Sequence, residues 1–150
     1  MTSIREEMPV LVRHEGDWGG TYTLVDLEGK ILDRHQSHLS CEFPTDGSFP
    51  YYQTNRYTWS DGRYEEHKFP GTYRDKILWF DTERIDGKAW EVDDSTVILW
   101  FSYKGITGAY LYEMIQISPC NNHRARTWHW FKDNKIYQRT LIQEERMRSI

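Results

Sequence analysis

The stretch from residue 123 to residue 142, HRARTWHWFKDNKIYQRTLI, decides the fold, because it has the pattern of a β-hairpin. Asp133-Asn134 lies at its centre, and this dipeptide tolerates the positive φ angles of a two-residue hairpin turn. With the turn there, Phe131 pairs with Ile136, and the same register places Trp128 opposite Arg139. Directly opposed residues share a face. One face is therefore predicted to carry arginines, aromatic residues and a leucine: Arg124, Arg126, Trp128, Trp130, Tyr137, Arg139 and Leu141.

This mixture of arginine and aromatic residues suits the wall of a ligand cavity. Guanidinium groups stack on rings and bind carboxylates or enolates in a forked geometry. A solid core needs only apolar side chains, so two interpretations remain: a cavity wall, or a core of tryptophans with arginines along its edge. In the cavity interpretation, Trp128, Trp130, Tyr137 and Arg139 are candidate ligand-binding residues, and Arg126 is a candidate catalytic residue.

The composition favours one compact β domain over residues 1–150 and argues against two classes of partner. Aromatic residues make up 15% of the chain, with seven Trp and ten Tyr, which is typical of β structure and not of disorder. The formal net charge is −4 and the pI is about 5.9. We therefore expect neither nucleic acid nor an anionic membrane as a partner, while a homodimer stays an open alternative.

The cellular location is predicted from two features. The chain has no apolar run of about 18 residues, as a membrane span would require, and residues 1–7 lack the apolar stretch of a signal peptide. Cys41 and Cys120 form neither a disulfide framework nor a zinc pattern. We expect two free thiols and a cytoplasmic protein.

Upstream of the hairpin, short strand patterns alternate with turn signals. The expected strands are residues 18–26, 30–43, 51–59, 63–69, 76–85, 89–92, 96–103 and 109–118. Pro70-Gly71 and Asp86-Gly87 are interpreted as turns between them. Ser3 and Glu6 have the spacing of a capping box, which predicts a short helix or turn before the first strand.

About ten antiparallel strands with short loops need a way to protect their edges, and closure into an up-and-down barrel is the simplest one. An open sandwich is the alternative, but it needs longer crossover connections. The predicted fold is thus all-β, an antiparallel barrel of about eight to ten strands with room for one small ligand.

Gly16-Asp17-Trp18 resembles the Gly-x-Trp motif that opens the first strand of lipocalins and their calycin relatives. The wider pattern is similar to an uncharacterised lipocalin-like domain family of microbial proteins. The matching stretches are residues 18–22, 33–37, 53–59, 69–73 and 78–84. The resemblance implies a calycin-type barrel in which Trp18 packs across the closed end under an arginine, either Arg139 or Arg146. It also implies that cofactor-free cyclase chemistry, known from lipocalin-like proteins of natural-product pathways, is open to this chain.

Two further residues are candidate catalytic groups. On the strand at 30–43, His35 belongs to the more apolar face, so it is predicted to point inward, where a histidine can exchange a proton near neutral pH. His38 points the other way, so the two histidines cannot share a metal ion. Glu113 shares a face with Leu111 and Ile115, and a buried carboxylate there would need Arg126 as a partner or a raised pKa. In the alternative orientation of this strand, Glu113 lies outside.

Gln53, Asn55 and Tyr57 share a face with Trp59, and amides alternating with rings would orient a ligand. An exposed hairpin is the alternative for this strand. The sequence has no phosphate loop, metal cluster or nucleophile motif, and we expect no cofactor.

These residues lead to three hypotheses for a barrel that encloses a hydrophobic or aromatic small molecule. The first is a cofactor-independent cyclase or isomerase of secondary metabolism. The second is a carrier that uses the same residues for affinity alone. The third is a haem-binding barrel like the nitrobindins.

Overall fold

The computed structural model describes residues 3–148, which form a closed ten-stranded antiparallel barrel preceded by two short helices. The helices are α1 (Ile4–Glu7) and α2 (Pro9–Val12). The first five strands are β1 (Gly16–Asp26), β2 (Ile31–Glu42), β3 (Tyr51–Thr58), β4 (Tyr64–Arg74) and β5 (Ile77–Asp81). The other five are β6 (Ile85–Glu91), β7 (Thr96–Tyr103), β8 (Ala109–Ile117), β9 (His123–Lys132) and β10 (Lys135–Arg146).

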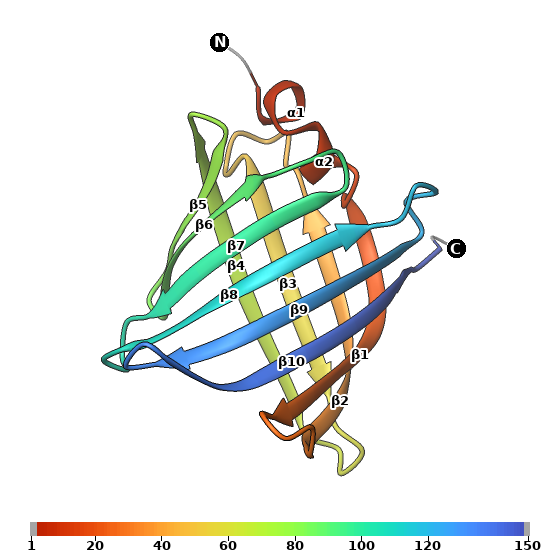
Figure 1. The fold of residues 1–150 in the computed structure, drawn as a ribbon. Coiled ribbons are helices and arrows are strands. Elements are labelled where there is room, and N and C mark those ends of the chain that lie inside the picture. Colours follow the sequence, from red (N-terminus) through yellow and green to blue (C-terminus); the bar gives the residue numbers. More distant parts are fainter. Residues whose placement is uncertain (1–2, 149–150) are drawn as a thin grey trace.

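Every strand pairs with its neighbours in the chain, and β1 pairs with β10 to close the sheet (Figure 1). This confirms the predicted up-and-down barrel, in which no strand is left with an unpaired edge. The alternating pattern of each strand sends one set of side chains into the interior. On β2, for example, Ser37, Leu39 and Cys41 are buried, as predicted for the inward face.

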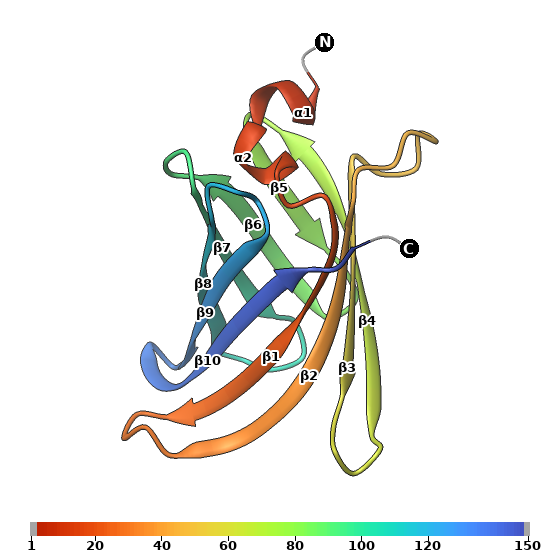
Figure 2. The same cartoon turned by 90° about the vertical axis from the view of Figure 1, so that its right-hand side faces the viewer.

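The two helices cover one end of the barrel, and the other end carries only hairpin turns (Figures 1 and 2). The Ser3 hydroxyl accepts a hydrogen bond from the Glu6 backbone N–H at 3.3 Å, so the predicted cap exists. Met8 is fully buried between α1 and α2, and Leu11 is 6% exposed in the same core. The helix pair therefore plugs the barrel, and the opposite end is its mouth.

Trp18 occupies the plugged end between two guanidinium groups. Arg124 lies 4.6 Å and Arg146 lies 4.4 Å from its ring centre, a distance at which a cation is attracted to an indole face. The indole N–H donates to the His14 carbonyl at 2.9 Å. Arg146 is thus the arginine over Trp18, and the other candidate, Arg139, is not.

The β9–β10 hairpin has the predicted turn but a different register beyond it. Asp133 and Asn134 have φ angles of 51° and 67°, and Phe131 pairs with Ile136 as expected. A bulge then leaves Tyr137 as an extra residue, so Trp130 pairs with Gln138 rather than with Tyr137.

The bulge moves every later pair of the hairpin by one residue. Trp128 faces Thr140, and Arg139 pairs with His129 on the outer face. Leu141 is likewise outside and 41% exposed. The predicted inward positions of Arg139 and Leu141 are therefore wrong, since a shift of one residue reverses the face of each side chain after the bulge. Tyr137, the bulge residue, is 43% exposed and does not line the mouth cavity.

Two glycines that were interpreted as turn residues lie inside strands instead. Gly71 is part of β4, and a Cβ atom there would lie 2.8 Å from the Leu78 side chain. Gly87 is part of β6, and its Cβ atom would lie 2.7 Å from that of Phe101. Both positions need glycine because large inward side chains pass close to the backbone.

Candidate functional site

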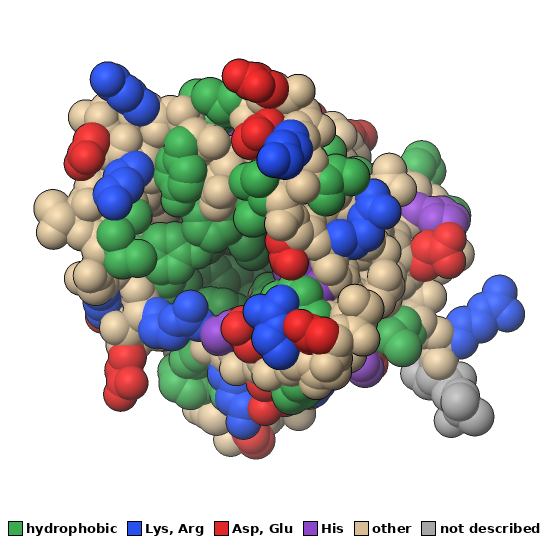
Figure 3. Space-filling view, turned by 90° about the horizontal axis from the view of Figure 1, so that it is seen from below, with side chains coloured by type: hydrophobic (Ala, Val, Ile, Leu, Met, Phe, Trp, Pro, Cys, Tyr) green, Lys and Arg blue, Asp and Glu red, His purple; other side chains and the backbone are tan. Residues whose placement is uncertain are grey.

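A cavity of about 200 Å³ opens at the mouth of the barrel, at the end away from the helices. Figure 3 looks into this end and shows a hollow lined by apolar side chains, with charged groups and histidine along its rim. Eight aromatic side chains line the cavity: Tyr22, Tyr57, Trp59, Phe69, Phe101, Tyr103, Trp128 and Trp130. They come from β1, β3, β4, β7 and β9 and from the residue that follows β3, so residues far apart in the sequence build one wall.

The rings on the β7–β9 side form an ordered stack. Tyr103 lies parallel to Trp130, with 5.8 Å between ring centres and 4° between planes. Trp128 meets Trp130 at 5.6 Å and an angle of 60°. Such surfaces favour flat, polarisable ligands, because rings gain energy from offset stacking and from edge contacts beyond simple burial. The predicted positions of Trp128 and Trp130 on an inner wall are confirmed.

His35 lies in the opposite wall and is oriented by a carboxylate. Its Nδ1 atom is 3.0 Å from Asp33, which also accepts from the Trp59 indole N–H at 3.0 Å. A carboxylate partner places the proton of a neutral imidazole on Nδ1, so Nε2 carries a lone pair. That Nε2 atom is buried and has no hydrogen-bond partner. The structure therefore contains an Asp–His pair whose outer nitrogen is buried beside the cavity and unpaired among residues 3–148.

A second polar atom beside this cavity also has no partner. The indole N–H of Trp128 is buried and has no acceptor in the part of the chain that the structure describes, whereas that of Trp130 donates to Thr140 at 2.8 Å. Both His35 and Trp128 pack on Tyr22, with ring centres 5.0 Å and 5.5 Å away. A buried polar group without a partner costs roughly 1–3 kcal/mol. One nitrogen of His35 and one donor of Trp128 thus remain unsatisfied beside the same tyrosine ring.

The polar residues of β3 point inward as predicted, but they bind one another. The hydroxyl of Tyr51 donates to Gln53 at 2.7 Å, and Gln53 donates to Asn55 at 2.8 Å. Asn55 in turn donates to the Tyr57 hydroxyl at 2.9 Å. This ladder runs from the plugged end to the mouth, and only Tyr57 of the three predicted ligand-binding residues lines the mouth cavity.

Below the cavity, four charged side chains form a buried cluster. Arg126 donates to Glu113 at 2.7 Å and to Glu144 at 2.8 Å, and Arg124 donates to Glu144 at 2.6 Å. Each of the four is less than 7% exposed. The inward position of Glu113 and its pairing with Arg126 are confirmed. Because two arginines meet two carboxylates here, the cluster carries no net charge toward a ligand.

The electrostatics of this cluster extend to two neighbours. Burial alone would raise the pKa of Glu144, but Arg124 and Arg126 outweigh it and lower that pKa to about 2. Burial and the charge of Arg124 lower the pKa of His14 to about 2, so this histidine stays neutral. Tyr22 completes the cluster as a hydrogen-bond partner of Arg126, and burial keeps its hydroxyl protonated by raising its pKa.

Two smaller cavities, of about 50 and 40 Å³, continue the mouth cavity toward the helices. The first shares Phe101 and Trp128 with the mouth cavity, and both are lined by Glu113 and Arg126. Each can hold a water molecule, since that requires about 10–15 Å³. The ligand-sized space is therefore the mouth cavity, with the charged cluster as its floor.

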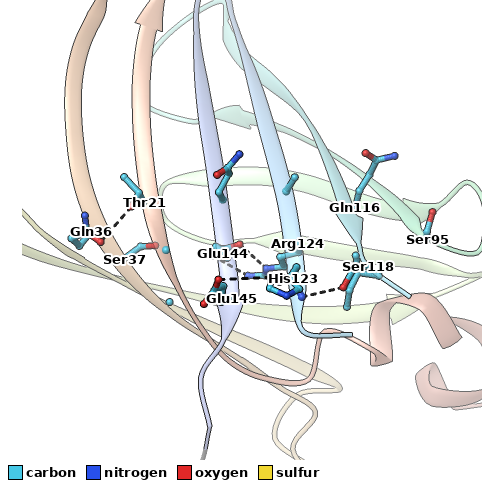
Figure 4. A pocket seen from close by; sticks show the side chains of 15 residues that line it. Thr21, Gln36, Ser37, Ser95, Gln116, Ser118, His123, Arg124, Glu144 and Glu145 are labelled. Atoms are coloured by element: carbon cyan, nitrogen blue, oxygen red, sulfur yellow. Dashed lines mark hydrogen bonds and ion pairs between the residues drawn. The ribbon is translucent and has the colours of Figure 1, made fainter. Parts of the chain in front are cut away.

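A larger concavity of about 940 Å³ lies outside, across β2, β1, β10, β9 and β8 (Figure 4). It is a wide, open trough lined by glycines and by polar and charged side chains. Its contacts are local, such as Thr21 with Gln36 at 3.4 Å and Ser118 with the His123 backbone at 3.1 Å. Nothing in it encloses a small molecule, so the mouth cavity is the candidate site.

Sequence reasoning missed four residues that shape the site: Tyr22, Asp33, Arg84 and Glu144. Tyr22 lies four residues after Trp18 on the same strand, and strand alternation would have indicated its inward position. Asp33 belonged to the predicted inward face of β2 without being given a role. Arg84 lies between strands, where alternation gives no information.

The described residues contain no group of three or more His, Cys, Asp or Glu side chains that could hold a metal ion. His35 and His38 lie on opposite faces, as predicted, and His38 contacts Asp17 at 3.1 Å on the outer surface. Over residues 3–148, none of the helices has the length and apolar character of a membrane span.

The chain belongs to the family described as "Domain of unknown function (DUF3598), N-terminal", which matches residues 5–149. A crystal structure of a DUF3598 protein from Nostoc punctiforme is similar with a TM-score of 0.70 and 17% identity. The similarity covers 91% of this chain and 49% of that one, so this chain spans about half the length of that relative. A search of curated proteins found no match.

Two other solved structures share the barrel. The S-type phycobiliprotein lyase CPES from Guillardia theta has a TM-score of 0.74 and 14% identity, and the similarity covers 95% of this chain and 93% of that one. Rv2717c from M. tuberculosis has a TM-score of 0.64 and 11% identity over 95% and 98% of the two chains. At such identities the likeness shows the fold alone, and the function rests on the site.

Proposed function

We propose that this barrel binds one small, flat, aromatic or conjugated molecule in the mouth cavity. The observation that carries the proposal is the pair of buried polar atoms without partners, His35 Nε2 and Trp128 Nε1, within an aromatic enclosure. A ligand with a donor group and an acceptor group would satisfy both atoms and stack on the rings around them. The four-residue charged cluster then serves as a rigid floor.

The volume limits the size of the ligand. About 200 Å³ is below the roughly 300–1,000 Å³ of sites for drug-sized molecules. The enclosed part of the ligand is therefore about the size of two fused rings, and a longer molecule would extend through the open mouth.

A second candidate function, isomerisation or cyclisation without a cofactor, is supported by the Asp33–His35 pair. His35 Nε2 would remove a proton from the bound molecule, and Asp33 would stabilise the imidazolium that forms. Glu113 and Arg126, the other predicted catalytic residues, would act by fixing the floor under the substrate, since each is paired inside the protein. The phycobiliprotein lyase among the similar structures supports the idea that such a barrel can host catalysis.

A carrier without catalysis and a haem-binding barrel are the alternatives. Of the two histidines that line the mouth cavity, His67 has contacts at both ring nitrogens, with Glu65 and Arg84. Of these two, His35 has the unpaired ring nitrogen, so it would be the iron ligand. A Soret band after titration with haem that is lost in His35→Gln would support the haem alternative.

Binding is tested with 2-naphthamide, a neutral two-ring probe, by isothermal titration calorimetry. Leu24 lines the mouth, and Thr23 beside it faces the outer surface, opposite the exposed Leu141. Leu24→Trp fills the cavity and is expected to abolish binding, while Thr23→Trp leaves it unchanged. Equal binding by both variants would place the probe elsewhere and refute the proposal.

Catalysis is tested with 5-nitrobenzisoxazole, which opens to a coloured nitrophenolate when a base removes its C–H proton. The proton moves to His35 Nε2 as the ring N–O bond breaks, and the electrons end on the phenolate oxygen. We expect the wild type at saturating substrate to turn over faster than His35→Gln, because the variant lacks the imidazole base whether or not its affinity changes. Equal rates for both proteins would leave binding as the function.

Other predictions from the sequence accompany this proposal. The Gly16–Trp18 motif and Arg146 over the Trp18 ring support membership of the calycin superfamily. Cys41 is buried and Cys120 is exposed, and both are free thiols, in keeping with a cytoplasmic location. The single domain over residues 1–150 and the homodimer stay predictions.

A further inference from the structure

The arginines that the sequence offered as anion-binding groups are engaged elsewhere. Arg124 and Arg126 are neutralised by Glu113 and Glu144 in the buried cluster. Arg139 lies on the outer face of β10. A ligand in the mouth cavity therefore meets none of these three positive charges.

One arginine that lines the mouth cavity has no carboxylate partner. Arg84 follows β5 and immediately precedes β6, and no Asp or Glu oxygen of residues 3–148 lies within the 4 Å of an ion pair with its guanidinium. Its side chain makes one hydrogen bond, from Nη1 to the Nδ1 atom of His67. A guanidinium has five N–H donors, so most of its capacity is unused within the described chain.

The acidic groups of the mouth are already held by donors. Asp33 accepts hydrogen bonds from His35 and Trp59, and Glu65 contacts Nε2 of His67 at 3.2 Å. Because Arg84 always donates, Nδ1 of a neutral His67 accepts and its Nε2 proton points at Glu65. The charge of Asp33 is thus bound by donors of the β2 and β3 side, and His67 of β4 lies between Glu65 and the Arg84 guanidinium, which has no carboxylate of residues 3–148 in direct contact.

Tyr103 supplies a second donor on the Arg84 side. It lines the same cavity from β7, next to β6, and its ring stacks on Trp130. Burial raises the pKa of Tyr103 above its ordinary value of 10, although the charge of Arg84 opposes this effect, so the hydroxyl keeps its proton. A guanidinium and a phenol O–H on one side of an aromatic cavity form a suitable receptor for a planar oxyanion.

We infer that the ligand of this barrel carries a carboxylate, or another planar oxyanion, at its outer end, and that Arg84 binds it. This inference rests on the proposed binding function and adds the class of ligand: an aromatic acid, with its rings on the Trp128–Trp130 side and its charge at the mouth. The forked geometry of a guanidinium matches a carboxylate, whereas lysine would bind it as a point charge.

The test compares 2-naphthoate with 2-naphthamide, which have the same shape and differ in charge. Titrations at about pH 7.5, where the carboxyl is ionised, use the wild type, Arg84→Gln and a control, Arg34→Gln. Arg34 lies on the outer face of β2 and contacts Thr23, far from the ligand. A charged hydrogen bond to arginine corresponds to an affinity difference of about tenfold.

We expect the wild type and Arg34→Gln to bind 2-naphthoate about tenfold more tightly than 2-naphthamide. Arg84→Gln should lose this preference and keep its affinity for 2-naphthamide. If the wild type binds both probes equally, or Arg84→Gln weakens both alike, the inference is wrong even though the cavity binds ligands. If Leu24→Trp leaves the binding of both probes intact, the proposed function itself fails.

Discussion

Glu144→Gln is the substitution that most directly tests the buried floor of the barrel. The glutamine keeps the shape of the side chain but leaves Arg126 with Glu113 as its carboxylate partner and Arg124 with none among the described residues. The pKa of Glu144 falls from 4.5 to about 2 in the folded protein. At 1.36 kcal/mol for each pKa unit, ionised Glu144 contributes about 3 kcal/mol to folding. Removal of one partner from a buried ion pair costs a similar amount, roughly 3–5 kcal/mol.

The direction of the pKa shift of Glu144 decides the pH at which its contribution to stability can be measured. A carboxyl group whose folded pKa is depressed stabilises the protein fully above its unfolded pKa and loses this effect as the pH falls through the folded value. The contribution of Glu144 is therefore complete above pH 4.5 and disappears toward about pH 2. Urea unfolding near neutral pH, followed by tryptophan fluorescence, measures all of it.

The matched control is the next residue. Glu145 points outward with its side chain 80% exposed, and it contacts only the imidazole of His123, at 3.9 Å, among the described basic groups. Glu145→Gln should change the free energy of unfolding by at most about 0.5 kcal/mol. If Glu144→Gln is destabilised no more than this control, the buried cluster does not stabilise the fold, and the argument for a rigid floor is refuted.

Two further substitutions test the packing and the pH dependence of the barrel. A Cβ atom on Gly20 would lie 2.1 Å from the Gln143 carbonyl, so Gly20→Ala should destabilise by roughly 1–3 kcal/mol, while Gly105→Ala, with open space around it, should not. Equal urea midpoints for the two variants would contradict the close packing of β1 against β10 at Gly20. His14 is held neutral by burial and by Arg124, with a pKa lowered from 6.5 to about 2, so unfolding takes up a proton at acidic pH. The free energy of unfolding of the wild type should fall as the pH drops below 6.5, and that of His14→Gln should fall less between neutral pH and about pH 5. If urea titrations show the same pH dependence for both proteins, His14 is not held neutral in the folded state.

The sequence predicts the barrel because each local signal agrees with the global fold. Asp133-Asn134 adopts the positive φ angles that its composition suggested, and the first cross-strand pair follows from the turn alone. The bulge at Tyr137 has no comparable signal, since it is neither a glycine nor a proline. One extra residue was enough to reverse the faces of Arg139 and Leu141, because side-chain orientation in a strand has a period of two.

The candidate site was predictable only where regular strands carry it. Strand alternation placed His35, Trp128 and Glu113 on the interior, and the pairing of Glu113 with Arg126 followed from the requirement that a buried charge be neutralised. Which charges remain unpaired is a property of the assembled barrel. Arg84 could not be recognised in advance, because its lack of a carboxylate partner depends on where β4 and β7 lie.

The pairing of β1 with β10 has a consequence for synthesis of the protein. During synthesis β1 gains one neighbour from β2 within a few residues, but its other edge stays unpaired until residues 135–146 have emerged from the ribosome. Until then the nascent sheet is open, and its exposed edge can pair with other chains. A chain truncated after β9 should therefore aggregate rather than form a smaller barrel, because β1 then lacks its second neighbour.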